Sequence, residues 1–339
     1  MDLYTSLRPL LFRLDAETAH HLGLSGLALA HKLGLSRLLA PPAVHKPVQH
    51  MGLCFDNPLG LAAGLDKNGD YIDALAALGF GFIELGTVTP RPQPGNPKPR
   101  LFRLPEAGAL INRMGFNNKG VEHLVARVRR ARYRGVLGVN IGKNFDTPND
   151  RAIDDYLFCL RKTFSLASYI VVNISSPNTK GLRDLQHDQE LEKLVRALVQ
   201  ARQDEAEKLG RSVPLLVKIA PDLDAGALYS MVDIFLRHGI DGVIATNTTL
   251  ARDGVAHLPA GGEQGGLSGE PLRERAVSVL RLLRERAGSE LTIIAAGGIS
   301  SAADASERLA AGADLLQIYT GLIYKGPHLI ADILSELSS

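Results

Sequence analysis

The amino-acid sequence predicts an α/β protein: a (β/α)8 (TIM) barrel at residues 46–339, preceded by a small helical extension at residues 1–45. From residue 57 onward one unit repeats eight times, in which a short apolar run leads into a polar or glycine-rich loop and then an amphipathic helical stretch. The runs are continuously apolar, as expected for parallel strands covered on both faces. This rhythm fits the barrel. An open doubly wound sheet is the alternative, but it usually carries GxGxxG after a strand, which this sequence lacks.

The predicted strands are short and rich in Val, Ile and Leu. They are residues 58–63, 81–87, 135–141, 169–174, 214–219, 241–247, 291–297 and 314–320. Helical patterns follow them, for example at 70–78, 118–131, 191–209 and 300–311.

Two long loops interrupt the rhythm. Residues 88–117 are rich in proline, and residues 248–270 are rich in glycine. Loops of this length in a compact domain are usually functional or disordered.

The extension, residues 1–45, reads as two helices with leucines on one face. It is either a helical cap packed on the barrel or a small apolar surface that meets a membrane or a lipid-like ligand. Four basic residues punctuate it and would suit anionic lipid headgroups: Arg8, Arg13, Lys32 and Arg37.

Composition describes a globular protein, with 45% hydrophobic and 22% charged residues. A net charge of +2 gives no electrostatic case for nucleic acid. The two cysteines, Cys54 and Cys159, have no metal-ligand spacing, and the ten histidines include no HExxH, so no metal site is expected. No secretory signal and no apolar run of membrane-spanning length is visible.

Polar residues cluster where the predicted strands end. The stretch YIVVNISSPNTKGL (169–182) passes from an apolar strand into asparagines, serines and Pro177, which ends the strand. In such a barrel chemistry gathers at these ends. Lys218 interrupts an apolar strand, and a buried lysine needs an anionic or electron-rich partner. The alternative for Lys218 is a structural ion pair.

Three glycine-bearing turns predict a phosphate site. AAGGIS (295–300) and YTG (319–321) follow the last two strands, where barrels frequently bind a phosphoryl group, and GLSGEPL (266–272) adds a third turn. Each turn is a weak signal alone, and their joint placement is a stronger one.

Eight motifs in order along the barrel resemble the dihydroorotate dehydrogenase family: LAAGLDKNG (61–69), NRMGFNN (112–118), VNIGKN (139–144), VNISSPNT (172–179), ATNTT (245–249), GGLSGEPL (265–272), AAGGI (295–299) and IYTGLIYKGP (318–327). The helical extension and Ser176 resemble the quinone-dependent class, since soluble classes typically use cysteine as base. The sequence has no four-cysteine iron–sulfur set and no NAD domain, which fits that class.

The resemblance implies an FMN enzyme that oxidises dihydroorotate to orotate in pyrimidine synthesis and passes electrons to a membrane quinone. It implies peripheral attachment to the cytoplasmic side of the inner membrane, with no protein partner required. Ser176 would be the base, with Thr179 organising a water beside it. The implied substrate residues are Lys67, Asn112, Arg113, Met114, Gly115, Phe116, Asn173, Asn178, Asn247 and Thr248. The implied flavin residues are Ala63, Gly64, Leu65, Asp66, Lys67, Thr87, Asn140, Asn173, Lys218, Thr246, Gly269, Gly298, Tyr319 and Thr320.

Three other functions remain open from the residues. One is a flavin barrel acting on a different pyrimidine, and a second is a non-redox barrel whose substrate carries the phosphate. The third is a non-catalytic, membrane-associated binding protein. A yellow purified protein would leave only the flavin-dependent functions.

Overall fold

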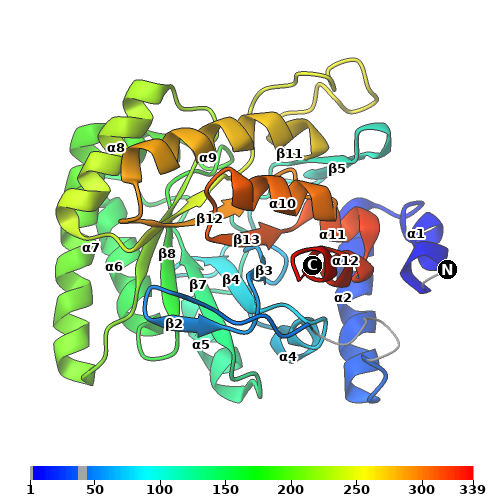
Figure 1. Cartoon of the computed structure of the whole chain (residues 1–339), viewed down its shortest axis with the longest axis horizontal. Coiled ribbons are helices and arrows are strands. Elements are labelled where there is room, and N and C mark those ends of the chain that lie inside the picture. Colours follow the sequence, from blue (N-terminus) through cyan, green and yellow to red (C-terminus); the bar gives the residue numbers. More distant parts are fainter. Residues whose placement is uncertain (1–2, 37–43, 339) are drawn as a thin grey trace.

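The computed structural model describes residues 3–36 and 44–338, and its centre is a closed barrel of eight parallel strands (Figure 1). The strands follow one another around the barrel in chain order: β3 (Leu59–Leu61), β4 (Phe82–Val88), β7 (Val136–Ile141), β8 (Tyr169–Asn173), β9 (Leu215–Ile219), β10 (Gly242–Ala245), β12 (Thr292–Ala296) and β13 (Leu315–Ile318). Strand β13 pairs with β3 and closes the ring. All eight strands lie within the ranges predicted from the sequence or one residue beyond them, so the predicted barrel is confirmed.

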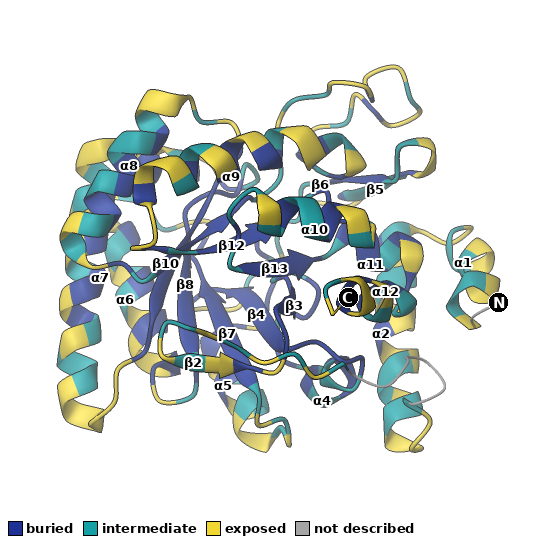
Figure 2. Cartoon of the chain, viewed as in Figure 1, coloured by how far each residue is buried: buried dark blue, intermediate teal, exposed yellow. Residues whose placement is uncertain are grey.

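Helices surround the barrel and bury their apolar faces against it, while their outer faces are exposed (Figure 2). They are α4 (Ile72–Ala76), α5 (Val121–Arg130), α6 (Ala152–Thr163), α7 (Asp188–Leu209), α8 (Ala225–His238), α9 (Arg273–Ala287), α10 (Ala302–Ala310), α11 (Thr320–Lys325) and α12 (His328–Glu336). Helix α8 illustrates the local signals. Asp224 caps its N-terminus by accepting a hydrogen bond from the N–H of Ala227, and Gly239 ends it with φ of 69°.

The barrel interior is apolar at one end and polar at the other. Alternate strand residues face inward, and ten buried residues form an apolar cluster that is separate from the larger core outside the strands: Phe55, Phe82, Val136, Tyr169, Val171, Leu216, Ile244, Ile294, Ala296 and Leu315. Phe55, from the hairpin β1 (Val48–His50) and β2 (Leu53–Phe55), packs edge-on against Phe82 with ring centroids 5.1 Å apart. The hairpin therefore plugs the apolar end.

Glu84 lies in the barrel interior and is fully buried. Its carboxyl oxygens accept hydrogen bonds from Asn140 Nδ2 (2.8 Å), Gln317 Nε2 (2.6 Å) and the Tyr169 hydroxyl (3.3 Å). These donors come from β7, β13 and β8, so one carboxyl group joins strands from different sides of the barrel. A buried carboxyl group is tolerated only with such partners.

The two long loops are ordered and form a sheet that sequence analysis did not predict. Strands β5 (Leu101–Leu104) and β6 (Ala109–Asn112) come from the proline-rich loop, and β11 (Gly266–Gly269) comes from the glycine-rich loop. They pair antiparallel in the order β11–β6–β5. Because the loops follow different barrel strands, this small sheet ties together two parts of the same barrel end.

The extension contains the two predicted helices, α1 (Leu3–Leu11) and α2 (Ala16–Lys32). Arg8 of α1 donates to the carbonyl of Tyr324 at 2.5 Å, and the Phe12 ring lies edge-on to Tyr324, centroids 5.4 Å apart. The extension therefore packs against α11, beside the end of the last barrel strand (Figure 1). In the described ranges, no helix is both long and apolar enough to cross a membrane.

Replacing Glu84 tests how far the barrel depends on its interior carboxyl group. Glu84→Leu should lower the free energy of unfolding by about 3–5 kcal/mol, because three buried donors lose their acceptor. Urea denaturation measures the change. Glu207→Leu, on the exposed face of α7, is the control and should stay within about 0.5 kcal/mol of the parent. An unchanged midpoint for Glu84→Leu would contradict a structural role for the network.

Candidate active site

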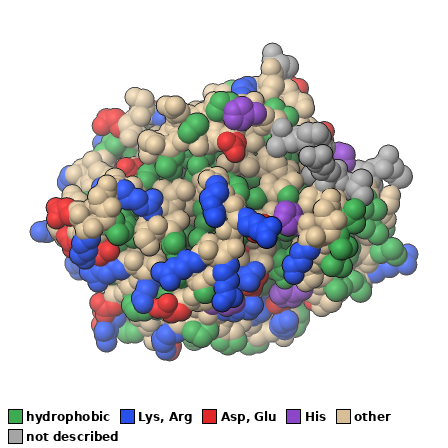
Figure 3. Space-filling model, turned by 90° about the horizontal axis from the view of Figure 1, so that it is seen from below, with side chains coloured by type: hydrophobic (Ala, Val, Ile, Leu, Met, Phe, Trp, Pro, Cys, Tyr) green, Lys and Arg blue, Asp and Glu red, His purple; other side chains and the backbone are tan. Residues whose placement is uncertain are grey.

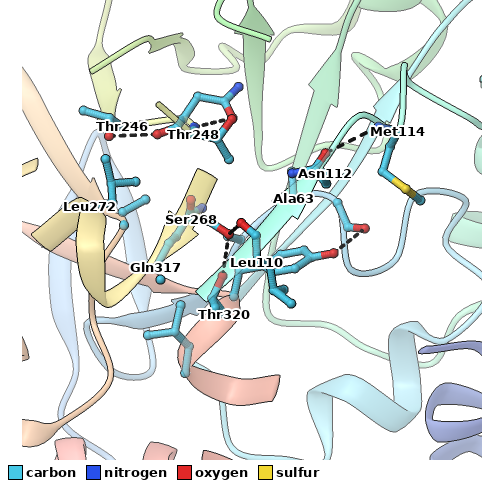
Figure 4. Close-up of a pocket in the computed structure, with 18 of the residues that line it drawn as sticks. Ala63, Leu110, Asn112, Met114, Thr246, Thr248, Ser268, Leu272, Gln317 and Thr320 are labelled. Carbon is cyan, nitrogen blue, oxygen red and sulfur yellow. Dashed lines mark hydrogen bonds between the residues drawn. The ribbon is translucent and has the colours of Figure 1, made fainter. Parts of the chain in front are cut away.

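A pocket opens at the polar end of the barrel, lined by residues at the strand ends and by residues of the small sheet β11–β6–β5, among them Leu110 and Ser268 (Figure 4). Most residues singled out from the sequence line it. They are Ala63, Gly64, Lys67, Thr87, Asn112, Met114, Gly115, Phe116, Asn173, Ser176, Asn178, Lys218, Thr246, Asn247, Thr248, Gly269, Gly298, Tyr319 and Thr320. Segments far apart in the sequence therefore meet in one cavity.

A chain of hydrogen bonds runs from Glu84 up to this pocket. Because Asn140 Nδ2 donates to Glu84, its Oδ1 is left to accept from the Thr87 hydroxyl at 2.5 Å. The Thr87 oxygen in turn accepts from Asn173 Nδ2 at 2.9 Å. The Asn173 Oδ1 then accepts from the Ser175 hydroxyl at 3.0 Å. A carboxylate can only accept, so it fixes which way each amide in the chain points.

Thr87 reaches this chain because β4 is irregular. The pairing of β4 with β7 shifts register between Leu85 and Val88, and Gly86 between them has φ of 101°. A Cβ on Gly86 would lie 2.3 Å from the carbonyl oxygen of Asn140. Glycine is thus required at the bulge that turns Thr87 into the pocket.

The loop after β8 carries Ser176, which is 5% exposed. Its hydroxyl oxygen accepts from the N–H of Asn178 at 3.2 Å. Asn178 Nδ2 donates to Asn112 Oδ1 at 3.2 Å, and Asn247 Nδ2 donates to the Ser175 hydroxyl oxygen at 2.9 Å. Side chains from three loops therefore surround Ser176 with carboxamides, which offer both donors and acceptors to a ligand.

Two lysines line the pocket: Lys218 is buried, and Lys67 is partly buried. For Lys218 Nζ, no hydrogen bond or ion pair to a described residue is found. Burial lowers the pKa of Lys218, and the charge of Glu84 acts against that change. Lys67 Nζ donates to the carbonyl of Gly64 at 2.8 Å, and burial lowers its pKa to about 8, against the charge of Glu17. Both amines are suited to an anionic or electron-rich ligand.

The predicted phosphate turns converge at one side of the pocket. Gly269, Gly297 and Gly298 all have positive φ, and a Cβ on Gly298 would lie 2.4 Å from Cα of Arg273. Ser268 and Thr320 hydroxyls lie 2.8 Å apart beside these turns (Figure 4). The fully buried Arg308 donates to the carbonyl of Gly297 at 3.0 Å and holds the turn from behind.

Two buried polar atoms of pocket residues have no hydrogen-bond partner in residues 3–36 and 44–338: Gln317 Oε1 and Thr248 Oγ1. Gln317 Nε2 is committed to Glu84, so its carbonyl oxygen is left for a donor on a ligand. Within the described part of the chain, no cluster of three or more His, Cys, Asp or Glu side chains is placed to hold a metal ion.

Four of the predicted site residues do not line the pocket. Arg113 turns away and pairs with Glu263 at 2.7 Å, and Leu65 is part of the core. The Asp66 carboxylate accepts from the backbone N–H of Asn68, Asp70 and Tyr71, at 3.3, 3.0 and 2.7 Å, and so shapes its own loop. Asn140 lies beneath Thr87, where it acts through the hydrogen-bond chain.

Sequence reasoning also missed residues that line the pocket. Gln317 and Ser268 sit on strands that read as apolar or turn-like, while Glu17 and His20 belong to the extension. A period-two reading of β13 would have placed Gln317 inward. Nothing in the sequence pattern would have brought Glu17 and His20 to the barrel.

The family model described as dihydroorotate dehydrogenase matches residues 47–339. The chain belongs to the dihydroorotate dehydrogenase family. Proteins named dihydroorotate dehydrogenase (quinone) from Pseudomonas paraeruginosa (strain PA7) and Nitrosospira multiformis are each 58% identical to it. These matches cover 99% of this chain in both cases, and 98% and 96% of the relatives.

Solved structures of the family superpose closely. A ligand-free type DHODH from Eimeria tenella has a TM-score of 0.86 at 38% identity and covers 95% of this chain and 94% of its own. DHODH from the same organism in complex with ferulenol gives 0.85 at 37%, covering 95% and 90%. The resemblance to the family and its quinone-dependent class is confirmed. Dihydroorotate dehydrogenases are flavin-dependent oxidoreductases, so the prediction of a flavin enzyme is confirmed as well.

Proposed function

We propose that this chain oxidises dihydroorotate to orotate in de novo pyrimidine synthesis, with FMN as hydride acceptor and a membrane quinone as final electron acceptor. The observation that carries the proposal is the gathering of Lys67, Ser176 and four asparagines around one pocket in a chain 58% identical to proteins named dihydroorotate dehydrogenase (quinone). The asparagines are Asn112, Asn173, Asn178 and Asn247.

The pocket fits FMN on three grounds. At Gly269, Gly297 and Gly298 an added Cβ would collide with neighbouring protein atoms, so these turns depend on glycine, and glycine turns at this place in a barrel suit a phosphate. Among the residues that the structure describes, Lys218 is a buried amine without an acceptor, and the Gln317 carbonyl oxygen lacks a donor. FMN bound there would accept a hydride from the substrate carbon.

Substrate binding follows from the residues on the other side of the pocket. Protonated Lys67 would pair with the substrate carboxylate, and the asparagines would hydrogen-bond to its imide, which has both donors and acceptors. Ser176 would then remove a proton from the substrate carbon. Serine is a weak base at neutral pH, so it needs a relay. Thr179, buried and three residues on, would organise a water for that relay.

The extension supports peripheral membrane contact. Of the twelve large hydrophobic residues that are exposed in the described part of the chain, eight belong to it: Leu3, Leu7, Leu10, Leu14, Leu22, Leu29, Leu33 and Leu35. Figure 3 shows hydrophobic side chains gathered at the edge where the extension lies, beside Lys and Arg side chains. Such an amphipathic surface suits a lipid interface, here the cytoplasmic face of the inner membrane.

The basic residues of the extension differ in their suitability for headgroups. Arg13 and Lys32 are exposed and free to meet them, whereas Arg8 is bound to Tyr324. Arg37 lies outside the described residues.

The direct test of the proposed function is an anaerobic mixing experiment with flavin-loaded protein. Dihydroorotate should bleach the flavin absorbance, and a soluble quinone analogue should restore it. Flavin that stays oxidised in the presence of dihydroorotate would overturn the proposal. A protein that cannot be loaded with FMN would also overturn it, before any substrate is added.

Ser176→Ala should retain FMN and bind orotate, yet reduce the flavin at least about 10²-fold more slowly, because the proton acceptor is missing. Stopped-flow absorbance under anaerobic conditions measures that step alone. Ser278→Ala, at an exposed position of α9 that does not line the pocket, is the control and should reduce the flavin at the parent rate. Equal reduction rates in Ser176→Ala and the parent would exclude Ser176 as the base.

Lys218→Met should lower the reduction potential of bound FMN by about 30 mV or more, a tenfold change in the two-electron equilibrium. The physical reason is that a fixed cation favours the more negative, reduced state. Equilibrium titration against a reference dye measures the potential. If Lys218 serves only as a structural partner of Glu84, the potential will match the parent while stability falls.

Leu10→Glu in α1, where Leu10 is 58% exposed, should weaken sedimentation with vesicles of anionic lipid about tenfold or more, because a charge then enters the interface. Flavin reduction by dihydroorotate should be unchanged. Leu209→Glu, at a position 46% exposed at the end of α7, should leave vesicle binding intact. Equal effects of the two substitutions would argue against the extension as the lipid contact.

A further inference from the structure

The most buried side chain in the described part of the extension is a carboxylate. Among residues 3–36 only Glu17 and Leu24 are buried, with 4% and 7% exposure. Glu17 stands in the first turn of α2 and pairs with Arg100 through both oxygens, at 2.7 Å to one terminal nitrogen and 3.1 Å to Nε. Lys98 Nζ lies 3.4 Å from the same carboxylate. A buried, bidentate ion pair of this kind holds its geometry far better than an exposed ion pair does.

Arg100 uses its remaining nitrogen to shape the proline-rich loop. It donates to the carbonyls of Pro94 and Asn96 at 2.6 and 2.9 Å. Gly95 lies between them, and a Cβ there would sit 2.9 Å from the guanidinium and 2.3 Å from the Met114 carbonyl oxygen. The loop therefore folds tightly around the Arg100 side chain.

Asn96 carries this arrangement into the substrate pocket. Its Nδ2 donates to the carbonyl of Arg113 at 2.9 Å and to that of Asn178 at 3.3 Å. Asn178 and Asn112, next to Arg113, both line the pocket and bond to each other. An unbroken series of contacts thus leads from α2 to the carboxamides around Ser176.

Glu17 also acts on Lys67 through its charge. Both line the pocket, and Glu17 raises the pKa of Lys67 against the effect of burial, while Arg100 lowers it and Asp66 raises it. Two histidines of α2 are also neighbours of this pair. Burial lowers the pKa of His20 to about 3, so it is neutral near pH 7. His21 Nε2 lies 4.0 Å from Glu17 Oε1 and is itself exposed. Burial acts to raise the pKa of Glu17 itself, but Arg100 and Lys98 outweigh it and hold that pKa below its usual value.

We propose that Glu17, although it belongs to the helical extension, is a positioning residue of the dihydroorotate half of the site: it holds Arg100 against the loop that shapes the carboxamide cluster, and it supplies the negative charge that keeps Lys67 protonated. The proposal rests on the proposed function, in which Lys67 receives the substrate carboxylate. It makes the extension a part of both half-sites rather than an attachment for the quinone alone.

The sign of the charge effect follows directly. Only protonated Lys67 pairs with a carboxylate, so binding of orotate weakens as the pH rises past the Lys67 pKa. Removing the negative charge of Glu17 lowers that pKa further. The pH at which orotate binding begins to weaken should therefore fall, by about one unit.

The experiment measures orotate affinity by calorimetry across about pH 6 to 9 for full-length, flavin-loaded protein. Glu17→Gln keeps the shape and an oxygen for Arg100, and it should move the alkaline break to lower pH. Asp15→Asn is the matched control. It removes one charge two residues away, asparagine caps a helix as well as aspartate, and Asp15 is not among the charges acting on Lys67. Its break should coincide with the parent.

Arg100→Lys tests the loop-shaping role separately. It keeps a charge beside Glu17 but cannot reach the carboxylate and both carbonyls at once, so orotate binding should weaken about tenfold or more at every pH without a shift of the break. This variant also serves if Glu17→Gln fails to fold.

The outcomes separate the two proposals. A parent protein that binds no orotate and is not reduced by dihydroorotate refutes the proposed function itself. A parent that does both, with Glu17→Gln and Arg100→Lys curves superimposed on its own, refutes the role of Glu17 alone. If Glu17→Gln weakens orotate binding equally at every pH and the alkaline break stays at the parent pH, the charge effect on Lys67 is refuted and only the structural role of Glu17 through Arg100 remains.

Discussion

The buried carboxyl group of Glu84 is the constraint on which the polar half of this barrel depends. A carboxyl group in the interior must be surrounded by donors, and here they come from Asn140, Gln317 and Tyr169. That requirement fixes the direction of the Asn140 amide, and with it the direction of every hydrogen bond through Thr87 to Asn173. The same charge stabilises the protonated form of Lys218. The carboxyl group of Glu84 therefore influences three pocket residues of different chemistry: it orients Thr87 and Asn173 through hydrogen bonds and acts on Lys218 through its charge.

The barrel and most of its pocket could be predicted from the sequence, because both follow from local pattern. Eight apolar runs define the strands, and parallel strands bring their carboxyl ends to one edge, so Asn173, Lys218 and Thr246 had to meet. The importance of Glu84 could not be predicted, since it depends on partners that the closed barrel supplies. The direction of the Arg113 side chain could not be predicted either. A sequence motif identifies adjacent residues, but it does not show that Arg113 turns away from the pocket to pair with Glu263.

The described part of the extension differs sharply in burial along its length. Eight of its leucines are exposed, while Glu17 is buried and pairs with Arg100. From sequence it was read as separate from barrel chemistry, because the leucine pattern dominates and a single glutamate in a helix usually faces water. The ion pair that joins the extension to the barrel loop connects residues 83 positions apart. A contact of that range leaves no local trace in the sequence.

The small sheet β11–β6–β5 determines how late in its synthesis the chain becomes able to bind a cofactor. Ser268 and Leu110 are hydrogen-bonded within this sheet and are 158 residues apart in the sequence. The barrel closes only when the last strand, β13, pairs with the first, β3. A ribosome-bound chain that has emerged only through β10 therefore lacks the strand β11 of the small sheet and the glycine turns that follow it. Its barrel also cannot close, because β13 has not been made. Contacts of such long range form late. Cofactor capture in the cell must then follow release of nearly the whole chain, so the apoprotein, rather than a flavin-bound fragment, is the species that chaperones and proteases meet first.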